Sequence, residues 1–432
     1  MKRFTLVLTS FLALLCTTIT HASVLTINPD SVEAASWIIY DPQSKQTIAE
    51  YNSHAQRAPA SLTKMMVAYL TLKAIQEGKL KTTDTITASD IVHVVQPDES
   101  QMFLRQGQQI TVDQLLSGLI VMSANDAAVT LAQKLGGDIP HFVEMMNSEA
   151  KALGMTDTHF MNPAGITMDG HYASAADLAK LANTLIQQYP QYLSYSKQTS
   201  YSWNGRTHHA TNILLKQDPT VDGLKTGYTA AAGYNLALTA NRPAMNPDFP
   251  ERRLIVVVMG TKSAYKRAQV AYELMNMAFN YTRDEVAIKA NQMIAQLPVI
   301  NGKQNVFNLK ANQSRIITTS LYDSNTPINM KNFSNTSGLI TIDGQTITPS
   351  QETKTQLSVQ LDQKQLTAPL NQEMNLANVK VFQNNQLIED FSLSAKVELE
   401  RASLFERFIH WLKHILPFFS DNATEAIVYP IK

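Results

Sequence analysis

Two residues with complementary chemistry, Ser61 and Lys64, stand three positions apart at the start of an apolar run. Apolar residues recur at helical spacing after Ser61, and no residue from Leu62 to Gln76 breaks a helix. A separation of three places both side chains on one helix face. A serine is inert until a base removes its proton, and burial at a helix start favours the neutral form of a lysine. The pair therefore predicts nucleophilic catalysis.

The same pair has a simpler interpretation, in which Ser61 only caps a helix and Lys64 lies on its solvated face. A Ser-x-x-Lys pattern occurs by chance about once in a chain of this length at ordinary composition. It recurs here at Ser194 and Lys197. The case for Ser61 therefore depends on the other motifs of the chain and on their order.

Two further motifs follow Ser61 in the chain. Ser123-Ala124-Asn125 separates two segments predicted to be helical, 113–121 and 125–135, and Lys225-Thr226-Gly227 lies on a predicted strand. Ser-x-Asn also occurs elsewhere, whereas Lys-Thr-Gly occurs once and is expected by chance in roughly one chain in ten. Hydrolysis through an acyl-enzyme needs a nucleophile, a base, an oxyanion site and a clamp on the substrate. The three motifs together match those needs.

The N-terminal segment and the charge of the chain indicate where the protein is located. Lys2 and Arg3 precede an apolar run from Phe4 to Cys16, and small residues end at Ala22, which is the pattern of a secretory signal peptide, residues 1–22. Cleavage there leaves 34 basic residues against 36 acidic ones, a net charge of about −2. It also removes the only cysteine, so the mature chain has no disulfide. Nothing in this charge indicates a nucleic-acid partner.

The order of predicted elements favours an α+β catalytic domain over residues 23–283. A hairpin at 34–51 precedes the helices, and three strands between 221 and 260 precede a closing helix over 264–279. The sheet of this domain thus draws on both ends of the segment. With 432 residues, the chain is too long for one ordinary core and predicts a second domain.

A different composition begins near Asp284. Alternating runs such as 339–342 are punctuated by turn pairs, which predicts hairpins at Asn301-Gly302, Asp343-Gly344 and Asn384-Asn385. We interpret residues 284–396 as a small all-β sandwich without a catalytic role.

The last segment, residues 397–432, contains a predicted amphipathic helix. Its apolar stripe consists of Leu404, Phe405, Phe408, Ile409, Leu412, Ile415, Leu416 and Phe419. The stretch is too short and too charged to span a bilayer, so we expect it to lie in the interface of the inner membrane, with Trp411 near the border. Pro417 is expected to end the helix at about Leu416. A helix packed on the protein's own core is the alternative.

In these motifs and their surroundings the chain resembles the penicillin-recognising serine enzymes, and among them the low-molecular-mass D-alanyl-D-alanine carboxypeptidases. The surroundings that carry the resemblance are residues 123–127, 162–165, 171–177 and 221–227. The resemblance covers nearly the whole chain, because that family also has a β-rich second domain and an amphipathic tail. It implies the fold shared by these transpeptidases and β-lactamases, an antiparallel sheet with a helical subdomain.

The resemblance also implies a role for each residue of the predicted site. Ser61 is expected to be the acylated nucleophile, Lys64 its general base and Ser123 a proton relay. The backbone N–H groups of Ser61 and Tyr228 are expected to form the oxyanion hole. The expected substrate-binding residues are Asn125, Lys225, Thr226, Gly227, Tyr228 and Arg267. Tyr228 replaces a histidine that is common in the family.

These observations predict a periplasmic serine enzyme that removes the terminal D-alanine from peptidoglycan pentapeptides, is acylated by β-lactams, and uses no metal or cofactor. A β-lactamase of the same superfamily is an alternative, although residues 160–176 contain no glutamate where a class A enzyme needs one. A non-catalytic peptidoglycan-binding scaffold is another, but it need not keep Lys64. A zinc carboxypeptidase is disfavoured because the chain has no His-Glu-x-x-His motif.

Overall fold

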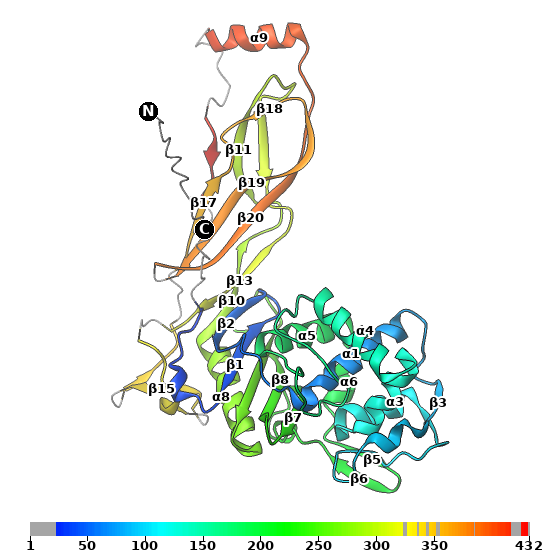
Figure 1. Ribbon diagram of the computed structural model, residues 1–432. Helices are drawn as coiled ribbons and strands as arrows, with labels where there is room; N and C mark the ends of the chain where they lie inside the picture. Colours follow the sequence, from blue (N-terminus) through cyan, green and yellow to red (C-terminus); the bar gives the residue numbers. More distant parts are fainter. Residues whose placement is uncertain are drawn as a thin grey trace, which may run out of the picture.

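The computed structural model describes residues 23–322, 326–334, 337–342, 345–350, 355–383, 385–415 and 425–430. The predicted signal peptide and the predicted helix stop at Pro417 lie outside the described residues. A wide unit of helices and sheet stands at one end of the molecule, an elongated β-rich unit rises from it, and helix α9 lies across the far end (Figure 1).

Five antiparallel strands form the central sheet of the first unit, in the order β2-β1-β9-β8-β7. Their bounds are β1 Ser36–Asp41, β2 Gln46–Tyr51, β7 Val221–Thr229, β8 Gly233–Pro243 and β9 Glu251–Thr261. Strand β1 pairs with β9, with Trp37 opposite Val258, so the sheet joins the two ends of the segment as predicted. In β9, Ile255 and Val257 face one core while Val256 and Val258 face another, because alternate side chains point to opposite sides.

Helices cover both faces of this sheet. Helix α8 (Ala264–Tyr281) packs on one face, and the helical subdomain packs on the other. Helix α1 (Lys64–Gln76) lies at the centre of this subdomain. It is apolar around most of its circumference, as expected for a helix that is buried on nearly all sides. The remaining helices are α2 Val112–Ser117, α3 Asn125–Gly136, α4 Ile139–Ala152, α5 Ala175–Gln188, α6 Tyr192–Ser196 and α7 Leu214–Gln217. Two separate antiparallel strand pairs complete this unit: β3 Thr85–Thr87 pairs with β4 Gln109–Thr111, and β5 Ser200–Trp203 forms a hairpin with β6 Arg206–His209.

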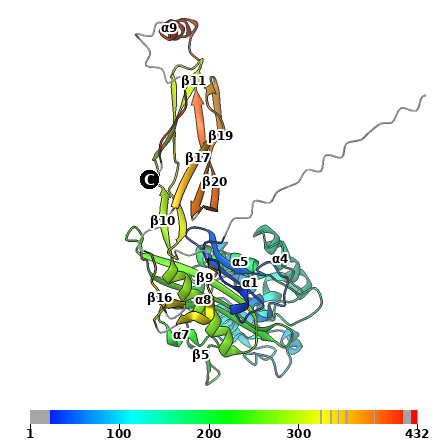
Figure 2. The same ribbon diagram turned by 90° about the vertical axis from the view of Figure 1, so that its left-hand side faces the viewer.

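The β-rich unit has a separate core, which includes Leu297, Leu309, Val379 and Val397. Figure 2 shows its long strands running away from the first unit. They are β10 Thr282–Ile288, β11 Met293–Ile300, β12 Val306–Lys310, β13 Arg315–Ser320, β17 Thr355–Leu361, β18 Leu366–Thr367, β19 Leu370–Gln383 and β20 Gln386–Leu399. All but the β11–β18 pair are antiparallel.

Part of the β-rich segment returns to the first unit. Tyr322, Ile328 and Met330 join the core beneath α8, and Ile328 bridges to Ile27 near the start of the described chain. A small sheet follows, with β14 Phe333–Ser334, β15 Leu339–Ile342 and β16 Gln345–Ile347. It lies beside α8 in Figure 1. The first unit is therefore completed by residues that follow Asp284 in sequence.

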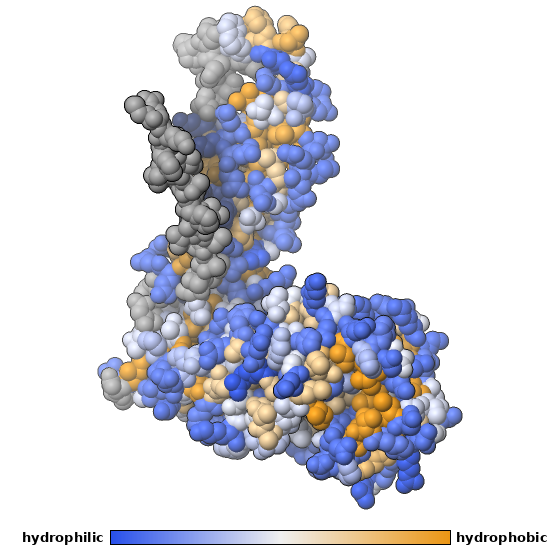
Figure 3. Space-filling model, viewed as in Figure 1, coloured by the Kyte–Doolittle hydropathy of each residue, from blue (hydrophilic) through white to orange (hydrophobic). Residues whose placement is uncertain are grey.

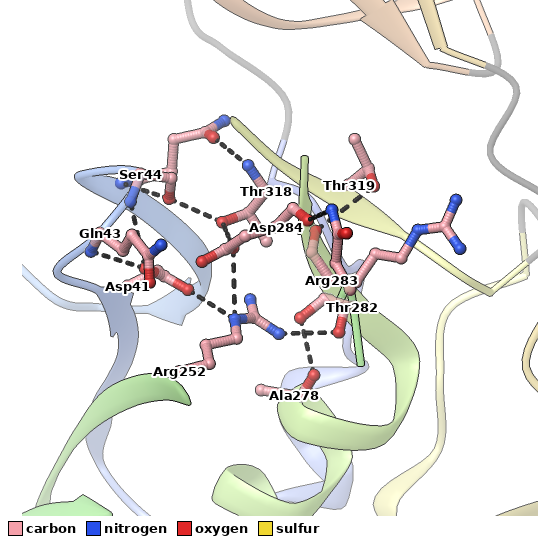
Figure 4. A network of polar contacts seen from close by, with 12 residues as sticks. Asp41, Gln43, Ser44, Arg252, Ala278, Thr282, Arg283, Asp284, Thr318 and Thr319 are labelled. Atoms are coloured by element: carbon pink, nitrogen blue, oxygen red, sulfur yellow. Dashed lines mark hydrogen bonds and ion pairs between the residues drawn. The ribbon is translucent and has the colours of Figure 1, made fainter. Parts of the chain in front are cut away.

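A buried ion network joins the two units (Figure 4). Arg252 Nε donates to Asp41 Oδ2 at 2.8 Å and lies 3.2 Å from Asp284 Oδ1. The Thr318 hydroxyl donates to the same Asp284 oxygen at 2.9 Å, and Arg252 Nη1 donates to the Thr282 carbonyl at 2.7 Å. Two carboxylates share one guanidinium in this network. Burial and the negative charge of Asp41 raise the pKa of Asp284 to about 7, although the positive charge of Arg252 lowers it in part.

Helix α9 (Leu404–Ile415) begins with a Ser403 hydroxyl that accepts from the Glu406 N–H. Its side chains Leu404 and Phe405 are 81% and 73% exposed, so this end of the helix does not pack on the core of the protein. Strand β21 (Ile427–Val428) then pairs antiparallel with β11. Within the described residues, every helix is too short or too polar to cross a membrane.

Candidate active site

Ser61 lies in a 3₁₀ turn, Ala60–Thr63, and α1 begins at Lys64. The prediction that Ser61 starts the α-helix itself is therefore slightly wrong, since the tighter turn precedes it. The turn nevertheless points both side chains the same way, and Lys64 Nζ lies 3.0 Å from Ser61 Oγ. The Ser-x-x-Lys pattern at Ser194 differs, because the Ser194 hydroxyl donates to the Gln191 carbonyl at 2.7 Å and Lys197 is exposed.

The amine of Lys64 is almost fully buried. It donates to the Ala164 carbonyl at 2.6 Å, which fixes its direction toward Ser61. Burial lowers the pKa of Lys64 to about 7, although the charges of Glu99 and Asp126 oppose this shift. A large share of the amine is therefore neutral near pH 7, and a neutral amine can accept the proton of the Ser61 hydroxyl.

The carbonyl that receives the Lys64 bond belongs to a loop that packs against the 3₁₀ turn. Gly165 has φ +84°, and a Cβ there would lie 2.1 Å from the Ala60 carbonyl oxygen, so only glycine fits. The Asn162 side chain accepts from the Gly165 N–H at 2.7 Å. Residues 162–165 thus hold the Ala164 carbonyl where it accepts from Lys64. The spacing of these residues in the sequence did not predict this contact.

His171 ties the same loop to the 3₁₀ turn and was missed as a site residue. Its Nδ1 accepts from the Met161 N–H at 2.9 Å, so Nε2 carries the proton and donates to the Thr63 hydroxyl at 2.9 Å. Burial lowers the pKa of His171 to about 4, and the imidazole is neutral at physiological pH. His171 therefore positions the turn that holds Ser61.

Ser123 lies between α2 and α3, as predicted, after a π-helical turn at Gly118–Met122. Its backbone is left-handed, with φ +61°, and its hydroxyl accepts from Lys225 Nζ at 2.9 Å. Lys225 is buried and also donates to the Thr226 carbonyl at 2.9 Å. Burial, with the neighbouring charges of Lys64 and Arg267, holds the pKa of Lys225 well below its usual range.

Asn125 starts α3, and its side-chain amide donates to the Glu99 carboxylate. Its backbone N–H donates to the Ser100 carbonyl at 2.7 Å. The next residue, Asp126, is buried and accepts from two N–H groups of the loop that follows Glu99. Sequence analysis missed Glu99, because the segment 80–112 has no clear periodicity that could place it.

Strand β7 carries the third motif on an outer edge of the central sheet. A Cβ on Gly227 would lie 3.0 Å from the Ser61 nitrogen, so the glycine allows the strand to run directly beside Ser61. Tyr228 follows, is 52% exposed, and stacks on Tyr234 with ring centroids 4.2 Å apart. An open strand edge beside a serine can receive an extended peptide.

Arg267 lies in the first turns of α8 and reaches the back of β7. Its guanidinium donates to the Thr211 carbonyl at 3.1 Å and to the Gly227 carbonyl at 3.5 Å. The Thr211 hydroxyl, in turn, bonds to the hydroxyl of Thr226. Burial lowers the pKa of Arg267 to about 10, so it keeps its charge at neutral pH. Contacts thus join Lys64 to Ser61, Lys225 to Ser123 and Arg267 to Gly227, and Gly227 lies beside the Ser61 nitrogen.

The chain is similar to several known proteins. Residues 23–263 match the model of a peptidase family described as D-alanyl-D-alanine carboxypeptidase. The D-alanyl-D-alanine carboxypeptidase DacD of Salmonella typhimurium is 40% identical over 57% of this chain, an alignment that spans 63% of that protein. DacD of Escherichia coli is 30% identical, over 89% of this chain and 92% of that protein. Penicillin binding protein 5 from Haemophilus influenzae, a crystal structure, aligns with a TM-score of 0.73 at 27% identity, covering 87% of this chain and 100% of that one.

Proposed function

This chain belongs to the D-alanyl-D-alanine carboxypeptidase family of serine-type peptidases, and we propose that it removes the terminal D-alanine from peptidoglycan stem pentapeptides through an acyl-enzyme on Ser61. The observation that carries the proposal is the 3.0 Å contact between Ser61 Oγ and Lys64 Nζ. Burial brings the pKa of that amine to about 7, which suits a general base at neutral pH.

In the proposed acylation, neutral Lys64 takes the proton of Ser61 as its oxygen attacks the carbonyl carbon of the penultimate D-alanine. The oxyanion that forms accepts from the N–H groups of Ser61 and Tyr228, which border the contact between the turn and β7. The proton then passes through Ser123 to the leaving nitrogen, and the C–N bond breaks to release D-alanine. Water attacks the acyl-enzyme in the second half of the reaction and restores Ser61.

Substrate binding is assigned to the residues around this centre. The edge of β7 at Gly227 pairs with the extended peptide, and the Asn125 amide faces its backbone. Thr226, Lys225 and Arg267 receive the terminal carboxylate. An anion beside Lys225 raises the pKa of its amine again, because an opposite charge favours the ammonium form. Binding of the carboxylate therefore restores the cation that burial disfavours.

Acylation by β-lactams follows from the same chemistry, because a strained lactam presents its carbonyl to Ser61 in place of the peptide. The relative from Haemophilus influenzae is itself named a penicillin binding protein. A β-lactamase also needs fast deacylation, and residues 160–176, which border Lys64 through Ala164, contain no glutamate to activate water. This favours the carboxypeptidase over the β-lactamase.

The membrane location belongs to the same proposal. The signal sequence exports the chain, and α9 holds the mature enzyme on the outer face of the inner membrane. Phe408 and Trp411 stack on each other and are exposed, together with Leu404 and Phe405. Apolar residues gather on α9, far from the first unit (Figure 3). The β-rich unit would then set the distance between the membrane and Ser61.

Labelled penicillin and a D-Ala-D-Ala pentapeptide test the activity on purified residues 23–432. We expect covalent label on Ser61 and release of D-alanine, and Ser61→Ala should abolish both. Ser194→Ala is the matched control, since it removes the serine of another Ser-x-x-Lys pattern and should change neither. Label that persists in Ser61→Ala, or an adduct mapped to Ser194 by mass spectrometry, would contradict the assignment.

A further inference from the structure

A hollow of about 780 Å³ lies between the loop that follows Glu99 and the β5–β6 hairpin. Figure 1 shows this hairpin at the lower edge of the first unit. Its size is within the range of small-molecule binding sites. It is lined by Met102, Phe103, Arg105, Gln106, Gln108, Trp203, Asn204, Arg206 and His208.

The lining of this hollow is cationic. It includes the guanidinium groups of Arg105 and Arg206 and no acidic residue. Among the described residues, neither guanidinium has an ion-pair partner. Three other hollows of the molecule each contain at least two glutamates in their lining. Charge complementarity therefore favours an anionic ligand here, because arginine binds carboxylates through two parallel hydrogen bonds.

The wall formed by the loop is held in a strained shape. Phe103 has φ +60°, which is unusual for a bulky residue, and its side chain is 56% exposed. The Asp126 carboxylate accepts from the N–H groups on both sides of it, those of Met102 and Leu104, at 2.9 Å each. This buried clamp turns the Phe103 ring outward. An exposed aromatic ring in a strained and firmly held backbone is typical of a binding surface.

Both walls continue from the active site. The loop is anchored beside Asn125 through Asp126, and the hairpin leads through His209 to Thr211, whose hydroxyl bonds to Thr226. The Trp203 indole N–H donates to the Met102 carbonyl at 2.9 Å and so joins the two walls. Each wall of the hollow is therefore tied to a segment that carries a predicted site residue, the loop through Asp126 next to Asn125 and the hairpin through Thr211 to Thr226.

We propose that this hollow is a second binding site for the substrate strand, in which Arg105 and Arg206 pair with carboxylates other than the terminal one. Phe103 and Trp203 pack against the apolar faces of the same segment. This inference rests on the proposed function, because it takes the peptidoglycan strand as the ligand. It assigns to the hollow the recognition of long, anionic substrates, while the chemistry at Ser61 needs only the D-Ala-D-Ala end.

The test compares two substrates on one double variant, Arg105→Ala/Arg206→Ala. The long substrate is a soluble disaccharide pentapeptide, and the short one is diacetyl-Lys-D-Ala-D-Ala, which has no carboxylate beyond its terminal one. We expect KM for the long substrate to rise about tenfold, with kcat unchanged. The kinetics on the short substrate and the rate of acylation by labelled penicillin should stay within about twofold of wild type. The control, Lys151→Ala/Lys289→Ala, removes two exposed cations elsewhere and should match wild type on both substrates.

Two results would overturn the proposal. One is an unchanged KM for the long substrate in the double variant. The other is an equal loss on both substrates, which would mean that the cleft itself is damaged. If the wild-type chain releases no D-alanine, the proposed function fails, and the hollow is then tested by equilibrium binding of the long substrate. Weaker binding by the Arg105/Arg206 variant than by the control supports the site, and equal binding refutes it.

Discussion

Lys225 Nζ donates to Ser123 Oγ at 2.9 Å, although 102 positions separate the two residues in the chain. The bond joins the second motif to the third across the cleft. The charge of Lys64 is among the causes that lower the pKa of Lys225, so the two buried amines are electrostatically coupled. A low-dielectric site disfavours two ammonium groups side by side, and this keeps a proton acceptor near Ser61.

The two lysines should respond differently to arginine. Lys64→Arg should reduce acylation by labelled penicillin to background, because an arginine cannot act as a neutral base at accessible pH. Lys225→Arg keeps the charge near the carboxylate site and should leave measurable acylation. Stopped-flow or gel-based labelling gives both rates. If the two variants lose acylation to the same extent, the division of roles between these lysines is wrong.

Acylation should rise with pH around neutrality. In the proposed mechanism the reactive form of Lys64 is the neutral amine, and its pKa is about 7, so the rate should increase through pH 7 and level off above it. At pH 5 the neutral fraction is about one hundredth, and acylation should be roughly a hundredfold below the plateau. The measurement is the rate of penicillin labelling between pH 5 and 9. A flat profile, or a rate that falls as pH rises through 7, would contradict the role of Lys64.

Asp284 should make stability fall between pH 4 and 7. Its pKa is about 7 in the folded protein and about 4 when unfolded, so the folded state binds the extra proton in this window. This bound proton stabilises the folded state fully below the pKa of Asp284 in the unfolded chain. The stabilisation is lost as pH rises through its pKa in the folded protein, by at most about 1.4 kcal/mol of unfolding free energy per pH unit. Asp284→Asn should flatten this part of the profile.

Chemical denaturation at several pH values measures the effect on the unfolding free energy. The control is Asp248→Asn, which changes an exposed carboxylate and should keep the wild-type slope. A variant at Asp284 with an unchanged slope would show that the proton is held elsewhere, for example on Asp41, whose carboxylate shares Arg252.

Membrane attachment should depend on the apolar face of α9. Phe405→Glu/Phe408→Glu should move the enzyme into the soluble fraction by at least about tenfold, because each buried phenylalanine stabilises the bound state. Val94→Glu/Met245→Glu changes two exposed apolar residues of the first unit and should leave attachment intact. High salt should not release the wild type, since charges near α9 are nearly balanced, whereas detergent should.

These substitutions are a sharper test than truncation. Strand β20 extends to Leu399, and β21 pairs with β11 after the helix, so cutting the chain after Val397 also removes strand residues. If the double variant stays with the membrane, or if salt alone strips the wild type, α9 is not the anchor.

Local features of this protein followed from its sequence. The helical spacing after Ser61 predicted that Lys64 faces the same way, because backbone geometry fixes that relation. The alternating apolar runs predicted β7, β8 and β9, and a break in periodicity placed Ser123 between two helices. The amphipathic stripe predicted α9. Each of these features depends only on residues that are close in sequence, within one or two helical turns or within one hairpin.

Contacts between distant segments were decided only by the tertiary structure. The bond from Lys64 to Ala164, the Glu99 partner of Asn125 and the clamp of Asp126 on its loop join segments without a shared periodicity. The return of Tyr322, Ile328 and Met330 to the core of the first unit had no local signal either. Burial by such segments lowers the pKa of Lys64, because desolvation depends on everything packed around the amine. The sequence thus determined which functional groups are neighbours along the chain. The fold determined which distant groups contact them and how far burial shifts their pKa values.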